Sequence, residues 1–315
     1  MKYAVIADIH GNLPALKAVL EDAAGQGITR FLFAGDYGIS GPWPDECVAL
    51  IRALPDRTVI RGNEEQYLEN LVGQDPAGWT DGQMQISYWT FRNMRRDNLD
   101  WLLSLPHTAE LECGGVRIRM AHHTQESMGA WVGPDSVRVA GRYAGAMITH
   151  DRLQADVRAD LEQDPASLER IAALEKGVYV FGHSHVQWTW RDEARGVYII
   201  NPGSCGLPLD AVPDSMPYTV LEITDGGRVR IEERRIPFDK AAYIRTIRQT
   251  APYREAAVWS RVIERELAFA REHMYFFLGF VKQYAEGIGD ERRPYAPDTW
   301  EKAYEIWSGQ QEEVP

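Results

Sequence analysis

Short apolar runs of strand character alternate with helical segments over the N-terminal part of the chain. Three runs rich in aliphatic and β-branched residues are predicted to be buried strands, over residues 3–7, 31–34 and 58–60. A helix is predicted after each of them: one capped by Asn12 with Pro14 in its first turn, one over 45–53 and one from about Glu65. This alternation predicts a layered α/β fold with strands in the interior.

Beyond residue 105 the pattern becomes mainly that of strands joined by short turns. Gly114-Gly115 and Asp225-Gly226-Gly227 indicate tight hairpins. Further strands are predicted over 111–113, 116–120, 178–181, 187–191, 197–200, 218–223 and 229–235. The polar stretch 125–175 predicts loops with one or two helices. Together these segments predict sheets packed face to face between helices.

The C-terminal part, residues 237–315, reads as a helical extension of a first domain over 1–236. Helices are predicted over 239–249, over 255–285 as one long helix or a broken pair, and over 299–307. Residues 274–281 are apolar around most of a helix, so that surface must be buried. Two interpretations stay open: the extension packs on the first domain, or it forms a homodimer contact.

Composition and charge narrow the class of protein. The 315 residues are 44% hydrophobic and 25% charged, as expected of a globular chain with a sizeable core. The net charge of −12 disfavours a long nucleic acid or an anionic membrane surface as partner. Three dispersed cysteines, no signal peptide and no apolar stretch near the ~20 residues of a membrane span favour a cytoplasmic protein with reduced thiols.

Histidines, carboxylates and one asparagine recur directly after predicted strands. Carboxyl ends of strands in α/β sheets are where ligands bind, so these side chains are expected to meet at one rim. The candidate ligands are Asp8, His10, Asp36, Asn63, His122, His183 and His185. Carboxylate and imidazole donors suit Mn, Fe, Zn or Co. Seven donors are too many for one tetrahedral zinc, but they suit two divalent ions about 3.5–4 Å apart that share a carboxylate.

In their order and spacing these motifs resemble those of the calcineurin-like metallophosphoesterases, and in particular of small microbial phosphodiesterases. The resemblance rests on ADIHGNLPAL, AGD, RGN, His122 and FGHSHV followed by NPGS, and it spans residues 4–204, with the following hairpins fitting the same domain. It implies a four-layer αββα sandwich of two mixed sheets flanked by helices. It also implies hydrolysis of phosphate esters by a metal-bound hydroxide.

The resemblance assigns a role to each matching residue. Asp8, His10 and His185 would hold the first metal, and Asp36 would bridge the two metals. The second metal would be held by Asn63, His122 and His183. Asn63 would also stabilise the charged transition state.

One position departs from the family pattern. Glu64 stands where many members carry a histidine that protonates the leaving oxygen. Three alternatives follow: Glu64 is the acid, His123 replaces the missing histidine, or the substrates have good leaving groups that need no acid.

Other residues near the motifs have both a structural and a functional interpretation. Asn12 is an N-cap that would also lie near bound phosphate, and Arg61 is a surface charge or a phosphate contact. Trp188 and Trp190 are expected in the core, with an aromatic wall for a nucleobase as the alternative.

The sequence thus predicts a phosphoesterase acting on a small phosphodiester or nucleotide. The alternatives are a dinucleoside polyphosphate hydrolase and a non-catalytic metal-binding scaffold.

Overall fold

The strands form two mixed sheets of five in the computed structural model, which describes residues 1–314. The first sheet has the order β10-β9-β1-β2-β3, and the second has the order β4-β5-β6-β8-β7. In the first sheet β1, β2 and β3 are parallel to one another, and β9 runs antiparallel to both of its neighbours, β1 and β10. In the second sheet β5, β6 and β8 are parallel, and the edge strands β4 and β7 run antiparallel to their neighbours β5 and β8. The strands are β1 (Lys2–Ile6), β2 (Arg30–Ala34), β3 (Asp56–Ile60), β4 (Thr108–Cys113), β5 (Val116–Ala121), β6 (Gly177–Val180), β7 (Gln187–Asp192), β8 (Val197–Pro202), β9 (Ser215–Ile223) and β10 (Val229–Pro237).

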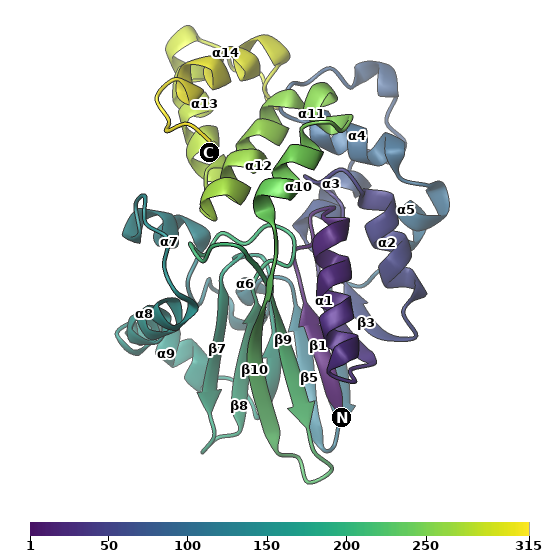
Figure 1. Cartoon of the computed structure of the whole chain (residues 1–315), viewed down its shortest axis with the longest axis vertical. Helices are drawn as coiled ribbons and strands as arrows, with labels where there is room; N and C mark the ends of the chain where they lie inside the picture. The colour runs from purple at the N-terminus through teal and green to yellow at the C-terminus, as the bar shows by residue number, and fades with distance from the viewer. Residues whose placement is uncertain (315) are drawn as a thin grey trace.

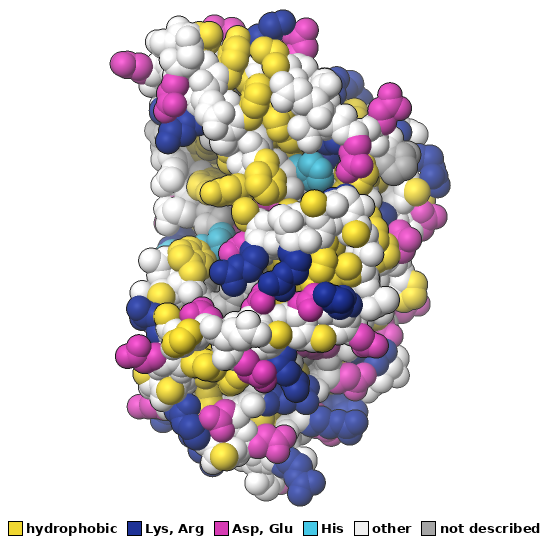
Figure 2. Space-filling view, turned by 90° about the vertical axis from the view of Figure 1, so that its left-hand side faces the viewer, with side chains coloured by type: hydrophobic (Ala, Val, Ile, Leu, Met, Phe, Trp, Pro, Cys, Tyr) yellow, Lys and Arg dark blue, Asp and Glu magenta, His cyan; other side chains and the backbone are white. Residues whose placement is uncertain are grey.

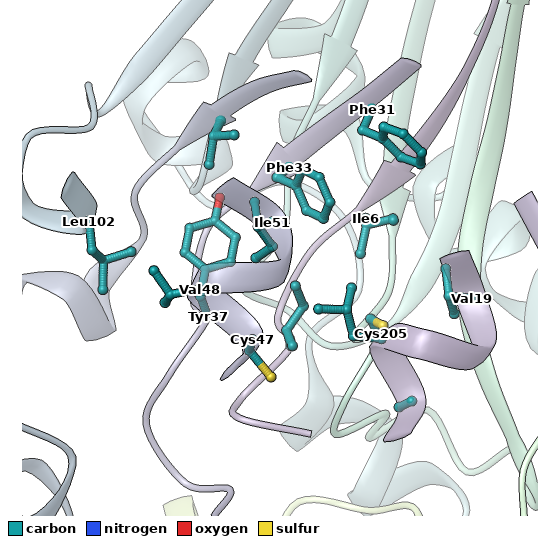
Figure 3. Close-up of a cluster of buried hydrophobic side chains, with 14 of the residues drawn as sticks. Ile6, Val19, Phe31, Phe33, Tyr37, Cys47, Val48, Ile51, Leu102 and Cys205 are labelled. Carbon is teal, nitrogen blue, oxygen red and sulfur yellow. The ribbon is translucent and has the colours of Figure 1, made fainter. Parts of the chain in front are cut away.

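The two sheets pack face to face, with helices on both outer faces. Side chains such as Val5 and Leu32 from the first sheet share one buried cluster with Ile118 and Val180 from the second. On the other face of the first sheet, Ile6, Phe31 and Phe33 pack against α1 (Leu13–Gly25), α2 (Pro44–Ala53) and α5 (Arg96–Leu103), as Figure 3 shows. The outer face of the second sheet packs against α7 (Ser136–Arg142), α8 (His150–Glu162) and α9 (Pro165–Ala172). The four-layer sandwich is therefore confirmed.

The helix α1 shows how local sequence sets an element. The Asn12 side chain accepts a hydrogen bond from the backbone N–H of Ala15 at 3.1 Å, and Pro14 lies in the first turn. The helix then buries Leu16 and Val19 against the sheet. Backbone N–H groups in the first turn of a helix have no partner within the helix, so a proline there costs no hydrogen bond. An N-capping asparagine followed by a proline therefore predicts the start of this helix well.

The segments between the strands contain more helices than the sequence pattern predicted. Residues 125–175 contain most of α6 (Thr124–Met128) and the whole of α7, α8 and α9, where one or two helices were expected. Leu153, Val157 and Leu161 recur every four residues along α8, but the polar residues around them mask this pattern. The short helices α3 (Asn63–Glu69), η1 (Pro76–Gly78) and α4 (Gln85–Asn93) connect β3 to α5.

The C-terminal helices sit over one end of the sandwich, as Figure 1 shows. They are α10 (Lys240–Ile247), α11 (Pro252–Glu255), α12 (Ala257–Phe269), α13 (Met274–Ile288) and α14 (Pro297–Ser308). The expected helix over 255–285 is a broken one. After Ala270, which has a φ of +48°, the Glu266 carboxylate accepts the N–H groups of His273 and Met274 at 2.8 Å and starts α13.

The extension has a hydrophobic core of its own that includes residues of the sandwich. Phe277 and Val281 of α13 are buried in a cluster that also contains Leu207 and Leu209. Tyr275 and Phe276, on the other side of α13, are exposed in the single chain. Within the part of the chain described, no helix has both the length and the apolar character needed to cross a membrane.

Candidate metal centre

Five loops at the carboxyl ends of strands bring the predicted ligands together. The loops follow β1, β2, β3, β5 and β6, so both sheets contribute. Five of the ligands have left-handed backbone conformations that non-glycine residues rarely adopt: Asp8, His10, Asp36, His183 and His185, with φ between +51° and +66°. Such strain persists only where the surroundings enforce it, and it is concentrated at functional sites.

The side-chain donors fall into three overlapping groups, and within each group the donor atoms lie within 4.8 Å of one another. The groups are Asp8 with His10 and His185, Asp8 with Asp36 and His122, and His122 with His123 and His183. The predicted ligands thus form one continuous cluster. His123, which the sequence offered as a proton donor, lies in it.

Within the cluster, two sets of donors face one another closely. The Nε2 atoms of His10 and His185 are 3.0 Å apart. On the other side, the Asn63 amide oxygen lies 3.2 Å from His122 Nε2 and 2.8 Å from His183 Nδ1. Asp36 connects to this second set through its Oδ2 atom, 3.3 Å from His122 Nε2.

Three of the imidazoles have their second nitrogen fixed by a protein oxygen. Nδ1 of His122 lies 2.6 Å from the carbonyl oxygen of Ala34, and Nδ1 of His185 lies 2.8 Å from that of Leu207. Nδ1 of His10 lies 2.9 Å from Glu64 Oε1. An N–H donated from Nδ1 leaves Nε2 as the free donor atom, which is the arrangement typical of metal-ligating histidines.

The protonation states also suit cation binding. Burial lowers the pKa of His183 to about 3 and that of His185 well below its usual value, so both rings are neutral near pH 7. Burial raises the pKa of Asp8 to about 7. For Asp36, burial is outweighed by the nearby His122, which lowers its pKa. For His10 and His122, burial is outweighed by the facing carboxylates of Glu64 and Asp36, which raise the pKa of each ring to about 10. Divalent cations would compensate these buried carboxylates in place of the two imidazole protons, so the residues present fit a metal site.

Comparison with known proteins identifies the family. Residues 1–226 match the calcineurin-like phosphoesterase superfamily domain. The chain belongs to this superfamily. It is 27% identical to an uncharacterised protein of Methanocaldococcus jannaschii. The alignment spans 266 residues, which are 79% of this chain and 93% of that protein.

Solved structures share the superfamily fold. A metallophosphoesterase from Sphaerobacter thermophilus aligns with a TM-score of 0.57 and 23% identity, over 86% of this chain and 100% of that one. A hypothetical protein from Pyrococcus horikoshii aligns with a TM-score of 0.56 and 15% identity, over 83% of this chain and 97% of that one. At these identities the likeness concerns the fold, so the chemistry rests on this chain's own residues.

Glu64 is buried at the position where the family resemblance would place a histidine. Its Oε1 faces His10 Nδ1, and its Oε2 accepts the backbone N–H of Ile39 at 3.0 Å. Burial raises the pKa of the Glu64 carboxyl, and the neighbouring His10 opposes this shift. Both oxygens of Glu64 therefore have partners within the protein.

Glu65, the next residue, was singled out in the sequence only as a helix start. It is completely buried, and its carboxylate accepts three backbone N–H groups: those of Gly62 at 2.7 Å, Tyr37 at 3.0 Å and Asp36 at 3.1 Å. It thereby ties the loop that carries Asp36 to the loop that carries Asn63. A carboxylate in the first turn of a predicted helix is common for other reasons, so the sequence alone does not reveal this role.

Two residues of the NPGS segment hydrogen-bond to the backbone of the loops that carry candidate ligands. The Asn201 amide donates to the Gly182 carbonyl at 2.7 Å, beside His183. The Ser204 hydroxyl donates to the Asp8 carbonyl at 2.6 Å. This segment supports the backbone of two ligands rather than contributing donors to the cluster.

The two candidate substrate-binding residues both have partners within the protein. The Asn12 amide donates to the Gly206 carbonyl at 2.9 Å, while its oxygen caps α1. Arg61 pairs with Glu69 at 3.2 Å and lies 2.9 Å from His107 Nε2. These contacts hold the Arg61 side chain against α3, the end of α5 and the segment that follows α5.

Proposed function

We propose that this superfamily member hydrolyses small phosphate esters at a centre of two divalent cations. The observation that carries the proposal is the convergence of all seven predicted ligands from both sheets into one cluster, of which four members are buried and three partly buried. Asp8, His10 and His185 would hold one cation, and Asn63, His122 and His183 the other, with Asp36 between them. Mn, Fe, Zn or Co would suit these donors.

When bound, such cations polarise phosphoryl oxygens and lower the pKa of water so that a nucleophile forms near neutral pH. The protein's own contribution is position and charge. His10, His122 and His185 are held by Glu64 and by two carbonyl oxygens, so their rings present Nε2 to the site. We assign to the Asn63 amide group a hydrogen bond to a phosphoryl oxygen, which strengthens as charge develops in the transition state.

The proton for the leaving oxygen has two candidate donors in the chain, Glu64 and His123. The contacts of Glu64 with His10 and Ile39 favour a positioning role for that carboxyl. Burial and the nearby His122 lower the pKa of His123 to about 4, so its ring is neutral at pH 7 and a poor acid. These facts favour substrates with good leaving groups, such as activated phosphodiesters.

A substrate panel tests this function. Manganese-loaded full-length protein and the same protein with excess chelator are compared on bis(p-nitrophenyl) phosphate, p-nitrophenyl phosphate, nucleoside monophosphates and diadenosine tetraphosphate. We expect metal-dependent turnover that is fastest on the diester. Preference for diadenosine tetraphosphate by orders of magnitude would instead indicate a dinucleoside polyphosphate hydrolase, and no turnover at all would favour the scaffold interpretation.

The role of Glu64 is tested by leaving-group dependence. If Glu64 supplies the proton, Glu64→Gln slows alkyl esters much more than nitrophenyl esters, because only the alkyl leaving groups need an acid. If Glu64 only positions His10, both classes slow by the same factor. We expect the second result, and a selective loss on alkyl esters would contradict it.

A further inference from the structure

A tryptophan that neither the family motifs nor the metal cluster uses lies at the rim of the site. The Trp131 side chain is 58% exposed. Its ring centroid is 5.2 Å from that of His183 at an angle of 25°, and 5.1 Å from that of His123. The indole is therefore stacked beside a metal ligand while much of its surface faces solvent.

The loop that carries Trp131 is held on both sides of this residue. The Thr124 hydroxyl donates to the Ala130 carbonyl at 3.2 Å and accepts the Val132 N–H at 2.9 Å. Val132 is buried in the cluster on the outer face of the second sheet. The backbone on either side of Trp131 is thus fixed by contacts that do not involve the indole.

Gly133 also helps to fix the position of this loop. Its φ is +95°, and a Cβ there would lie 2.4 Å from a ring atom of Trp188. Only glycine fits this close approach to the buried Trp188 ring. Trp188, expected in the core with an aromatic wall as the alternative, is therefore a core residue, and it supports the loop that presents Trp131.

A second exposed aromatic residue lies near the same ligands. Tyr67 is 45% exposed and follows Asn63 by four residues on α3, so the two share one face of that helix. Asn63 in turn contacts His183, on which Trp131 is stacked. Aromatic side chains thus flank the second set of ligands from both the α3 side and the Trp131 loop. On the face of the molecule shown in Figure 2, histidine side chains reach the surface next to hydrophobic ones.

We propose that Trp131 stacks against a flat ring of the substrate, which is a phosphate ester carrying a nucleobase or a similar aromatic group. This inference rests on the proposed function, because it places the phosphate at the metal ligands. The indole packs beside the rings of His183 and His123, and the exposed part of its surface is available to a second partner. Base–aromatic stacking tolerates any base and contributes roughly 5- to 150-fold in affinity.

Equilibrium binding to the manganese-loaded full-length protein tests the inference without requiring turnover. Calorimetric titrations compare AMP with ribose 5-phosphate, which lacks only the base, and free phosphate is measured after each titration. We expect the wild-type protein to bind AMP about tenfold more tightly than ribose 5-phosphate. Trp131→Ala and Trp131→Leu should lower AMP affinity about tenfold and leave ribose 5-phosphate within about twofold. Trp131→Phe, which keeps an aromatic face, should retain most of the AMP affinity.

Three results would overturn the inference: AMP binding no tighter than ribose 5-phosphate in wild type, equal losses for both ligands in the variants, or loss of bound manganese in Trp131→Leu. The last result would mean that Trp131 only supports His183. Hydrolysis of bis(p-nitrophenyl) phosphate is measured separately. Base-dependent binding without hydrolysis would contradict the proposed function and leave the role of Trp131 supported.

Discussion

Two adjacent carboxylates show how far the chemistry of a single residue depends on its direction. Glu64 and Glu65 are both buried, but Glu64 faces the imidazole of His10 whereas Glu65 faces backbone N–H groups. In the sequence the two residues are identical and adjacent, so a motif does not distinguish their roles. Only the three-dimensional structure separates a residue that orients a ligand from one that fixes a loop.

For Glu64, the expected consequence concerns metal affinity. Glu64→Gln replaces the carboxylate that faces His10 Nδ1 by a neutral amide, so the ring is a weaker and less well oriented donor. Manganese affinity should fall about 10- to 100-fold, as measured by competition with a chelator of known affinity. Unchanged affinity would show that the Glu64–His10 contact does not support the ligand.

For Glu65, the expected consequence concerns folding. Glu65→Gln leaves one amide NH₂ against the backbone N–H groups of Gly62, Tyr37 and Asp36, where only acceptors satisfy the donors. Unfolding in urea with chelator present should show a loss of about 2 kcal/mol. Glu64→Gln is the matched control, because it removes the same charge one residue away. Equal or greater loss in that control would contradict the assignment of the loop-fixing role to Glu65.

At the scale of elements, close approach between two loops builds the site. Gly206 packs against the loop after β1 so closely that a Cβ would lie 1.8 Å from the Ile9 carbonyl oxygen. Gly206 is also hydrogen-bonded to this loop, because its backbone N–H donates to the Asp8 carbonyl at 3.0 Å. The loop that carries Asp8 and His10 is thus clamped by the segment that follows β8.

Substitution of this glycine should loosen the clamp. Gly206→Ala forces the two loops apart, and we expect a loss of at least about 2 kcal/mol in stability together with lower manganese affinity. Gly226→Ala is the control, because a Cβ in that hairpin turn meets no atom closer than 3.9 Å. The control should stay within about 0.5 kcal/mol of wild type. Similar behaviour of the two variants in denaturation and metal titration would show that the close contact is not required.

The elements that the sequence predicted well are those whose signal is local. Every predicted strand is present, because short apolar or alternating runs bounded by turn residues are a local signal. The start of α1 follows from Asn12 and Pro14. Helix α8 was harder to predict, because polar residues surround its few apolar ones. The break after Ala270 was also harder to predict, because it depends on a hydrogen bond from the backbone N–H of His273 to the carboxylate of Glu266.

The candidate site followed the same division. The clustering of the candidate ligands was predicted because they directly follow strand ends, which meet at one edge of the sheets, and this needs no knowledge of side-chain packing. The directions of Glu64 and Arg61, and the presence of Trp131 beside His183, depend on tertiary contacts that no local pattern encodes.

For the whole molecule, the site is a junction between the two sheets. Asp8, Asp36 and Asn63 follow strands of the first sheet, and His122 and His183 follow strands of the second. The C-terminal extension lies beside this junction: the Leu207 carbonyl contacts His185, and the Leu207 side chain packs in the core of the extension. Trp259 of α12 also donates to the Ser40 hydroxyl at 3.1 Å.

The charge distribution bears on the class of substrate. Residues 1–236 contain 33 acidic and 23 basic side chains, and we expect this excess of negative charge to disfavour an extended polyanion as substrate. Two bound divalent cations would make one point of this surface attractive to a single phosphate group. A small phosphate compound fits this distribution better than a long nucleic acid.

The central claim is that seven side chains hold two catalytic cations. The most direct measurement determines manganese per chain and bis(p-nitrophenyl) phosphate turnover in the reconstituted full-length protein and in His183→Ala. We predict about two ions per wild-type chain, with fewer ions and no turnover in the variant. Fewer than one ion per wild-type chain without turnover, or full activity in His183→Ala, would contradict the account.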